Sequence, residues 1–294
     1  MATVLAPTQI SLKRILVAVD FSPCSEMALH YAAALTRREQ GKVFLAHVLP
    51  VEAMYPFPTD PLPLDMDTDQ PLTHMQQMIS APELKDIPAE MLAERGELWP
   101  VLEDMVRTHN IELVVVGTHG REGLKKLFMG SAAEEVFRRA TCPVLTVGPR
   151  VDRECLQDGL LRRIVYATDF SASSLHALPY ALQLAHEHGA HLTFVHALAS
   201  AIPMAEFGPT TFTENELESA RAELRQLLPV GVDADLVVEV GIPAEIITAV
   251  AEQHKASLIV VGLHAQSLFA ATHLPWTTAH RVVCDAHCPV LTVR

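Results

Sequence analysis

The stretch RILVAVDFSPCSEMALHYAAAL (residues 14–35) indicates a buried strand, a tight Asp-Phe-Ser turn and a long helix. Ser22 is a suitable N-cap for that helix, and Pro23 suits its first position. The same pattern returns as RIVYATDFSASSLHALPYALQL (163–184), where Ser171 takes the place of Ser22. The sequence therefore predicts that this strand-turn-helix segment is used twice.

The repetition extends over the rest of the chain. The matching pairs are VFLAHVL (43–49) with LTFVHAL (192–198), VVVGTHG (114–120) with VVGLHA (260–265), and CPVLTV (142–147) with CPVLTV (288–293). Self-similarity over such a distance indicates homologous domains. We expect one domain at 1–150 and the other at 151–294, with the polar stretch 149–159 as the linker.

In each half, short β-branched runs alternate with helical patterns, which is typical of an α/β fold with a parallel sheet covered by helices on both faces. Third strands are expected at 89–96 and 234–241, and last strands at PVLTV in both halves. The segment from Pro50 to Pro71 holds six prolines and few cues for regular structure, so it is expected to form an irregular lid or arm. Ligands of such folds bind at the carboxyl ends of the strands.

Composition and charge favour some classes of function over others. The 294 residues carry a net charge of −13, which argues mildly against non-specific binding to nucleic acid or to a membrane surface, although a local basic patch stays open. The N-terminus lacks the pattern of a signal peptide, and no apolar run approaches the roughly 18 residues of a membrane span. Five cysteines without a CxxC pair favour reduced thiols. A cytoplasmic protein is expected.

The loop GTHGREGLKKLFMGS (117–131) lies between an apolar strand and a predicted helix. Free backbone amides at a helix N-terminus attract anions, and Arg121, Lys125 and Lys126 add positive charge, which suits a polyphosphate. The alternative is that glycines merely end the strand and Ser131 caps the helix. Asp20, at the end of the first strand, could reach the same crevice or could cap a turn.

These motifs together resemble the universal stress protein family in its tandem form, with two such domains in one chain. The resemblance implies a doubly wound, five-stranded parallel sheet of order 3-2-1-4-5 in each domain (the adenine nucleotide α-hydrolase-like fold). It also implies ATP with Mg²⁺ as cofactors, and an intramolecular pseudo-dimer formed through the last strands. The residues implied in ATP binding are Asp20 at the adenosine, the Val48 backbone at adenine, and Gly117, Gly120, Arg121, Gly130, Ser131 and Ala132 at the ribose and phosphates.

The second half departs from this pattern. Ala265 replaces the second glycine, and alignment on CPVLTV places Trp276 over Gly130. No Lys, Arg, Asp or Glu occurs in 265–277, so no cation remains there to balance a triphosphate. We therefore expect the second half to bind ATP weakly or not at all, or to accept a less charged ligand.

Other side chains have competing interpretations. His280, Cys284, His287 and Cys288 would share a helix face if the helix reached Cys288, as zinc ligands do, but Pro289 and the lone Cys142 of the first half favour a structural role. His47 and His196 are expected to be core histidines bonded to the backbone. Cys24 lies near a helix N-terminus, which would suit a redox thiol.

Three functions remain open on the sequence. The first is an ATP-binding regulatory protein of the stress response, with an unknown protein partner. The second is a slow ATPase at the same site, although no P-loop, G-x-S-x-G or G-x-G-x-x-G motif is present in its expected context. The third is a partner-binding protein with a vestigial pocket. Pairing of two chains into a homodimer also stays open.

Overall fold

The computed structural model describes residues 10–49, 69–118, 129–151, 155–157, 160–199, 212–263 and 278–294. The first half contains β1 (Arg14–Ala18), α1 (Pro23–Glu39), β2 (Lys42–Leu49), α2 (Asp69–Ile79), the 3₁₀ turn η1 (Pro82–Leu84), β3 (Ala89–Arg95), α3 (Leu98–Thr108), β4 (Leu113–Gly117), α4 (Ser131–Arg139) and β5 (Val144–Val147). The second half contains β8 (Arg163–Ala167), α5 (Ala172–His188), β9 (His191–Leu198), α7 (Glu214–Leu227), β10 (Ala234–Val240), α8 (Pro243–Gln253), β11 (Leu258–Gly262), α9 (Thr278–Asp285) and β12 (Val290–Val293).

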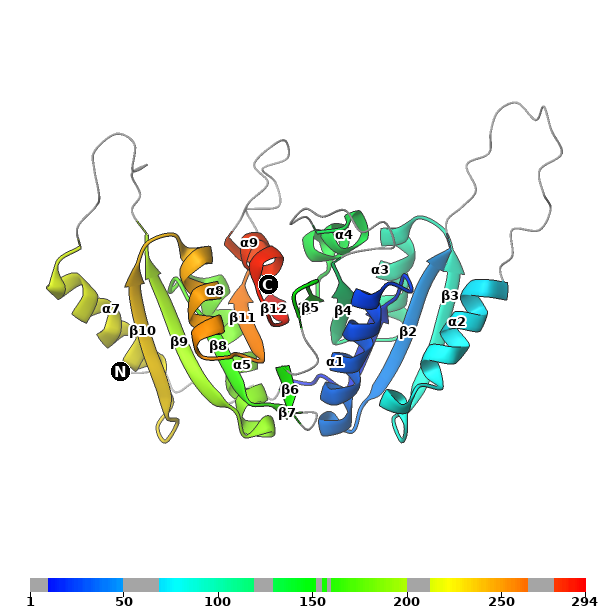
Figure 1. Ribbon diagram of the computed structural model, residues 1–294, viewed down its shortest axis with the longest axis horizontal. Coiled ribbons are helices and arrows are strands. Elements are labelled where there is room, and N and C mark those ends of the chain that lie inside the picture. Colours follow the sequence, from blue (N-terminus) through cyan, green and yellow to red (C-terminus); the bar gives the residue numbers. More distant parts are fainter. Residues whose placement is uncertain are drawn as a thin grey trace, which may run out of the picture.

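Ten strands form one sheet in the order β10-β9-β8-β11-β12-β5-β4-β1-β2-β3 (Figure 1). Each half thus has the predicted order 3-2-1-4-5, and the pairs within each half are parallel. The halves join where β12 pairs antiparallel with β5, with Leu291 opposite Leu145. The Thr292 hydroxyl adds a hydrogen bond to the Val144 carbonyl, at 3.1 Å. The predicted fold class is confirmed.

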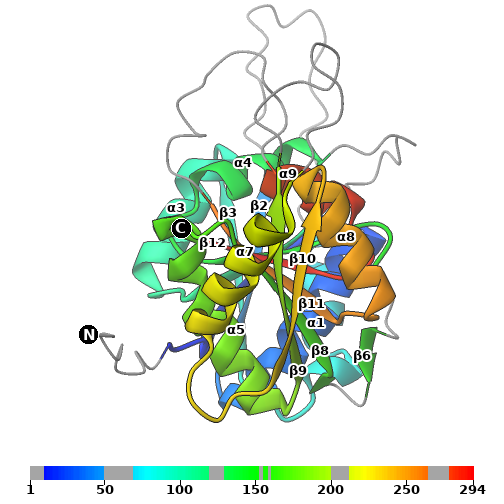
Figure 2. The same ribbon diagram turned by 90° about the vertical axis from the view of Figure 1, so that its left-hand side faces the viewer.

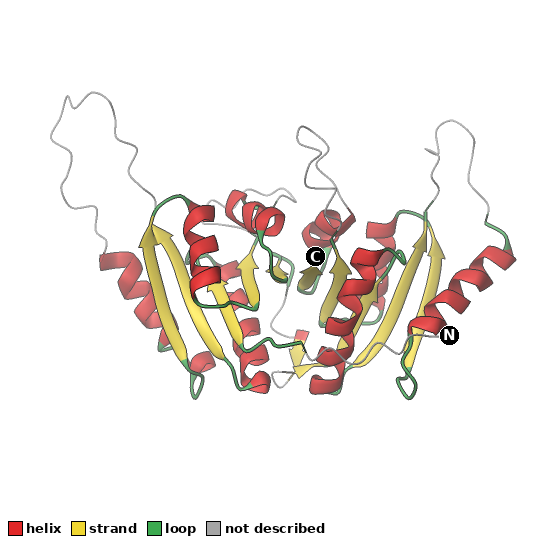
Figure 3. Cartoon of the chain, turned by 180° about the vertical axis from the view of Figure 1, so that it is seen from behind, coloured by secondary structure: helices red, strands yellow, loops and turns green. Residues whose placement is uncertain are grey.

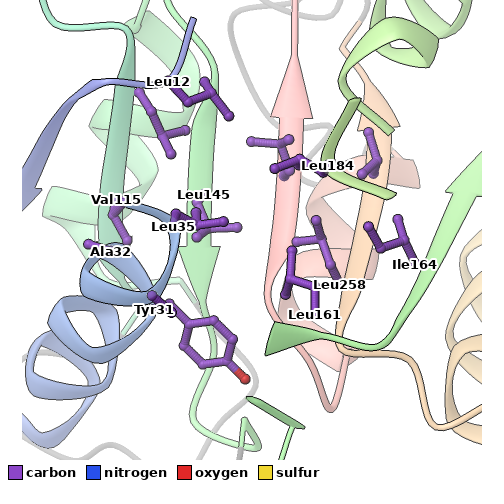
Figure 4. Close-up of a cluster of buried hydrophobic side chains, with 14 of the residues drawn as sticks. Leu12, Tyr31, Ala32, Leu35, Val115, Leu145, Leu161, Ile164, Leu184 and Leu258 are labelled. Atoms are coloured by element: carbon purple, nitrogen blue, oxygen red, sulfur yellow. The ribbon is translucent and has the colours of Figure 1, made fainter. Parts of the chain in front are cut away.

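Helices cover both faces of the sheet, as Figure 2 shows from one end. One apolar core cluster draws on α1, α2, α5 and α7, and the other on α3, α4, α8 and α9. The first cluster continues across the β5–β12 junction. Figure 4 shows Tyr31 and Leu145 of the first half, with Leu161 and Leu184 of the second half beyond the junction. The two domains therefore share a core.

The two long helices begin as the sequence predicts. The Ser22 hydroxyl accepts the Ser25 amide at 3.3 Å, and Pro23 takes the first position of α1. Ser171 caps α5 in the same way, with 3.2 Å to the Ser174 amide. A serine N-cap satisfies one of the amides that have no partner within the helix.

Two expectations about connecting segments need correction. Helix α2 already begins at Asp69, so the predicted irregular arm is wrong for its last three residues, while residues 50–68 lie outside the described part of the chain. The linker is not simply polar. It contains strand β6 (Leu156–Gln157), which pairs antiparallel with β7 (Leu160–Leu161) directly after the linker, and its Leu156 is buried in the shared core.

Among the described residues, no helix has the length and apolar character needed to cross a membrane.

Seen from behind, the sheet carries helices along both of its halves (Figure 3).

Candidate functional site

The candidate site lies at the carboxyl edge of the first half, where β1 separates β2 from β4. The strand order reverses at this point, because α1 leaves β1 for one face of the sheet and α4 follows β4 on the other. Asp20, Val48 and Gly117 lie at the ends of these three neighbouring strands. Gly120 and Arg121 belong to 119–128, outside the described residues.

Asp20 forms a tight turn in front of α1. Its Oδ1 atom accepts the Ser22 amide at 3.0 Å, two residues along the chain. Asp169 makes the same bond to the Ser171 amide, also at 3.0 Å. The turn-capping role considered for Asp20 is therefore present in both halves, and any role toward a ligand is additional to it.

The backbone of Val48 faces the β1 side of β2 beyond the last paired residue of β1. Alternate residues of a parallel strand bond to opposite neighbours. The Ala46 carbonyl accepts the Val19 amide at 2.9 Å, whereas the Leu49 carbonyl accepts the Gly96 amide of the β3 side at 3.0 Å. Val48, two residues after Ala46, therefore directs its amide and carbonyl toward the crevice that β1 leaves open.

His47 keeps that backbone edge out of the ladder. The next rung would join the Val48 amide to the Val19 carbonyl, but His47 Nδ1 donates to this carbonyl at 2.7 Å. No bond between the Val48 amide and Val19 is found in the described part of the chain. The prediction of a histidine bonded to the backbone is confirmed, although His47 is only half-buried and lies at the edge of the site.

Phe21 adopts a left-handed backbone, with φ of 63°. Such a conformation costs a bulky residue about 1–2 kcal/mol, and strain of this kind gathers at functional sites. The Phe21 ring packs on the His47 ring, with 4.6 Å between centroids. The sequence analysis did not identify this residue, although its recurrence in both Asp-Phe-Ser turns was the available signal.

Gly117 has a packing role that the sequence did not reveal. A Cβ atom at this position would lie 2.6 Å from the Cys24 backbone carbon, because the first turn of α1 crosses directly over the end of β4. The equivalent Gly262 would meet the Ser173 carbonyl oxygen at 2.3 Å. Close approach of the helix therefore explains why both halves keep this glycine.

Gly130 and Ser131 form the start of α4. Gly130 is the N-cap, with φ of −59°, a value open to any residue, and its amide donates to the Thr118 carbonyl at 2.5 Å. The first bond within the helix runs from the Glu134 amide to the Gly130 carbonyl at 2.8 Å. The amides of Ser131, Ala132 and Ala133 precede that bond and so have no acceptor within the helix. Together with the helix dipole they could hold an anion.

An open hollow of about 480 Å³ lies beside Ser131. Its described lining is Ser131, Glu134, Glu135, Arg138 and Arg139. The charges of this lining pair within the helix, because Arg138 lies 3.8 Å from Glu134 and Arg139 lies 3.5 Å from Glu135. The hollow provides room for a ligand beside Ser131. Because the arginines and glutamates of its lining pair with one another, we expect the free amides of α4 to be the groups that attract an anion there.

The described part of the second half repeats this edge. His196 Nδ1 donates to the Thr168 carbonyl at 2.8 Å, and its ring packs at 4.5 Å from that of Phe170, whose φ is 60°. The Leu198 carbonyl accepts the Gly241 amide at 3.1 Å, which directs Ala197 toward the crevice as Val48 is directed. Of the loop differences between the halves, Gly130 lies in the described part of the chain, whereas Gly120, Arg121 and the whole of 264–277 lie outside it.

Within the described ranges, no group of three or more His, Cys, Asp and Glu side chains could hold a metal ion. Helix α9 ends at Asp285, before His287 and Cys288. Cys284 and His280 do approach each other, with 3.8 Å between Sγ and Nδ1. All five cysteines are free thiols.

Comparison with known proteins gives consistent results. The family model described as "Universal stress protein family" matches residues 11–148 and 161–294. Universal stress protein A homolog 1 of Coxiella burnetii is 28% identical over 143 residues, covering 46% of this chain and 95% of its own. Universal stress protein A of Photorhabdus laumondii is 32% identical over 153 residues, covering 48% and 97%. A universal stress protein structure from Archaeoglobus fulgidus matches 96% of this chain and 98% of its own, with a TM-score of 0.65 at 18% identity, and so supports the fold.

Proposed function

Because this chain belongs to the universal stress protein family, we propose that its first half is an ATP-binding regulatory domain and that its second half binds ATP weakly or not at all. The carrying observation is the convergence of three features at one sheet edge. These are the Val48 backbone outside the ladder, the Asp20 carboxylate, and the helix-terminal amides that begin at Ser131.

Each feature suits a different part of ATP. The amide and carbonyl of Val48 offer a donor and an acceptor side by side, as the edge of adenine requires. The Asp20 carboxylate can accept hydrogen bonds from ribose hydroxyls. The α4 amides and the Ser131 hydroxyl can donate to phosphate oxygens. Arg121, in the loop outside the described residues, would add a cation.

Mg²⁺ would accompany the nucleotide. It prefers oxygen ligands and is commonly held by one or two carboxylates together with phosphates and water. The described site offers the Asp20 carboxylate and the Ser131 hydroxyl, which fits a cation that depends mainly on the phosphates. The role of this chain would then be to orient the phosphates through α4.

The asymmetry between the halves rests on the loops. Both halves keep the edge formed by the histidine, the left-handed phenylalanine and the Asx turn. The second loop carries Trp276 where the first carries Gly130, and it lacks cations. We interpret the two halves as an intramolecular pseudo-dimer in which ATP in the first half alters a surface for a protein partner. A cytoplasmic location and pairing of two chains stay predictions from the sequence.

Calorimetric titration of the full chain tests this proposal. We expect wild-type protein to bind a single ATP per chain, and Gly130→Trp to bind none at millimolar ATP. Because the φ of Gly130 is −59°, a side chain there needs no backbone strain. Ile242→Trp is the matched control, since Ile242 is the exposed N-cap of α8 in the other half and has an extended backbone.

Two results would contradict the proposal: no binding by the wild type, or two equivalent ATP sites. Timed phosphate release from the same samples separates a binding protein from a slow ATPase. Release that is lost in Gly130→Trp but kept in Ile242→Trp would favour the enzyme.

A further inference from the structure

Helix α4 of the first half lies beside α9 of the second half, near the centre of the molecule (Figure 1). The amino end of α4 is the proposed phosphate site, and its nine residues form a single short rod. Ser131 and Phe137 are therefore only about 9 Å apart along the helix axis. A contact that holds one end of such a rod also affects the direction of the amides at the other end.

The amino end of α4 is anchored within its own domain. The Gly130 amide donates to the Thr118 carbonyl at the end of β4. Beyond this bond, the buried side chains of Ala133, Val136 and Phe137 pack into the apolar core. Apolar packing is non-directional, so the hydrogen bonds at the two ends contribute most to the orientation of the helix.

The carboxyl end of α4 is held by the second half. The Arg294 guanidinium, directly after β12, donates to the Phe137 carbonyl at 2.6 Å. In the described part of the chain no backbone amide bonds to this carbonyl, which belongs to the last turn that a helix leaves unpaired. The Phe137 ring also meets the His280 ring of α9 edge-on, with 6.0 Å between centroids and 81° between planes. Both contacts cross from one domain to the other.

A cation suits the position of the Arg294 side chain. Burial lowers the pKa of its guanidinium, but arginine stays charged at neutral pH. A positive charge at the carboxyl end of a helix interacts favourably with the helix dipole, and an ionised donor forms a stronger hydrogen bond than a neutral one. Arg294 thus caps a helix of the other domain with a charge-assisted bond.

The same elements meet on the other side of the junction, but without the arginine. Alignment on CPVLTV places Gly148 over Arg294 and Val283 over Phe137. A Cβ atom at Gly148 would lie 3.4 Å from the Val283 carbonyl oxygen, so the end of β5 approaches α9 as the end of β12 approaches α4. Glycine has no side chain that could donate. At this pair of positions only the second half supplies a donor.

Arg150 provides an internal comparison. Two residues after Gly148, its guanidinium donates to the carbonyl of Asp285, the last residue of α9, at 3.2 Å and at an exposed position. Arg150 therefore also bonds one domain to the other, but at a helix that does not begin at the proposed ATP site.

We propose that Arg294 of the second half is a positioning residue for the phosphate site of the first half, because it holds the carboxyl end of α4 so that the amides of Ser131 and Ala132 face the phosphates. This inference rests on the proposed function. It gives the second domain a part in ATP binding that needs neither the glycines nor the cations that its loop lacks. Because coupling between two binding events is reciprocal, ATP in turn strengthens the contact between Arg294 and α4.

The test compares Arg294→Met, Arg294→Lys and Arg150→Met in the full-length protein. Methionine cannot donate, lysine keeps a cation that can, and Arg150→Met removes the comparable bond at α9. A hydrogen bond of ordinary strength corresponds to a change of about two- to tenfold in binding. In calorimetric titration we therefore expect Arg294→Met to weaken ATP binding about three- to tenfold, and the other two variants to stay within about twofold of wild type.

Hydrogen exchange of the Ala140 amide gives a readout that does not depend on ATP affinity. This amide closes the last turn of α4 by bonding to the Val136 carbonyl at 2.9 Å. In nucleotide-free protein we expect faster exchange in Arg294→Met than in Arg150→Met, with recovery in Arg294→Lys. ATP should slow the exchange in wild type by more than in Arg294→Met.

The outcomes separate this inference from the proposed function. Absence of ATP binding by wild type would contradict the proposed function itself. Binding by wild type with unchanged affinity in Arg294→Met would overturn the inference alone. Equal losses in Arg294→Met and Arg150→Met, unchanged Ala140 exchange in Arg294→Met, or no recovery in Arg294→Lys would overturn it as well.

His280→Ala is a second variant, should Arg294→Met fold poorly. It removes the ring contact to Phe137 and leaves the Arg294 side chain in place. We expect it to weaken ATP binding about two- to threefold, as for the loss of an aromatic pair, and to make exchange of the Ala140 amide faster. Wild-type values of both would show that the carboxyl end of α4 does not influence the phosphate site.

Discussion

Glu39 and Glu187 face each other across the junction of the two halves, at the last turns of α1 and α5. One carboxylate oxygen of each is buried without a hydrogen-bond partner. As two carboxylates they can only accept, so the contact becomes a hydrogen bond when one of them carries a proton. Burial and Glu187 together raise the pKa of Glu39 to about 7, with Gln183 and Lys13 opposing the rise.

This pair predicts a pH-dependent stability. A pKa raised in the folded state means that the stabilisation is present below the unfolded pKa of 4.5 and is lost as the pH rises through about 7. The full shift would correspond to ~3 kcal/mol, which solvent screening at this half-buried site reduces to about 1–2 kcal/mol. We therefore expect the unfolding free energy of Glu39→Gln, relative to that of wild type, to rise by that amount between pH 5 and pH 8. Denaturant unfolding at the two pH values measures this change.

Comparison with the Gln variant cancels the effect of His188, whose pKa burial lowers to about 4 and which acts in the opposite direction. Glu90→Gln is a control in which the stability should change with pH in the opposite direction. The Lys42 ammonium, 2.6 Å from Glu90, lowers the pKa of that carboxyl, so the stabilisation that Glu90 contributes is lost as the pH falls. Parallel pH profiles for Glu39→Gln and wild type would rule out a shared proton.

Gly117→Ala and Gly262→Ala should both destabilise the protein. Their Cβ atoms would lie at 2.6 and 2.3 Å from backbone atoms of Cys24 and Ser173. Overpacking of this kind costs about 1–3 kcal/mol. Gly148→Ala, whose nearest contact is 3.4 Å, should cost much less in the same urea titrations. Equal stability of all three variants would show that close helix packing is not why these glycines are present.

Asp20→Asn distinguishes the role of Asp20 in the turn before α1 from its proposed contact with ATP. An asparagine can still accept the Ser22 amide, so the unfolding free energy should stay within about 0.5 kcal/mol of wild type. Loss of the negative acceptor should weaken ATP binding about tenfold or more, as for a charge-assisted hydrogen bond. Asp169→Asn is the matched control, and calorimetry should find its ATP affinity unchanged. Equal effects of the two substitutions would contradict a site confined to the first half.

His47→Leu should remove the free backbone amide of Val48 that we propose binds adenine. Without the imidazole, the Val19 carbonyl becomes available to the Val48 amide, which would then join the ladder. We expect slower hydrogen exchange of the Val48 amide and an ATP affinity lower by about three- to tenfold. His196→Leu, the same change in the second half, should leave ATP affinity at the wild-type value. Unchanged exchange of the Val48 amide would show that His47 does not keep this amide from bonding to the Val19 carbonyl.

Much of the fold could be predicted because it depends on local patterns. The Ser22 and Ser171 caps, the strand runs and the repeat are written in consecutive residues, and the strand order follows from the family resemblance. The site was predicted less completely. Gly117 looked like a ligand glycine, yet its crossing with α1 accounts for it in both halves, because distance between elements is not encoded in their spacing along the chain.

The sequence by itself determined that this chain has two homologous α/β domains and that only the first carries the second and third glycines of the loop and its cations. The tertiary structure decided which residues meet across the junction. The carboxyl groups of Glu39 and Glu187 meet at a half-buried site, and the Arg294 guanidinium donates to the Phe137 carbonyl of a helix in the other domain. The physical reason is that periodicity and capping act over a few residues, whereas these contacts depend on how β5 and β12 pair and on how the helices then pack.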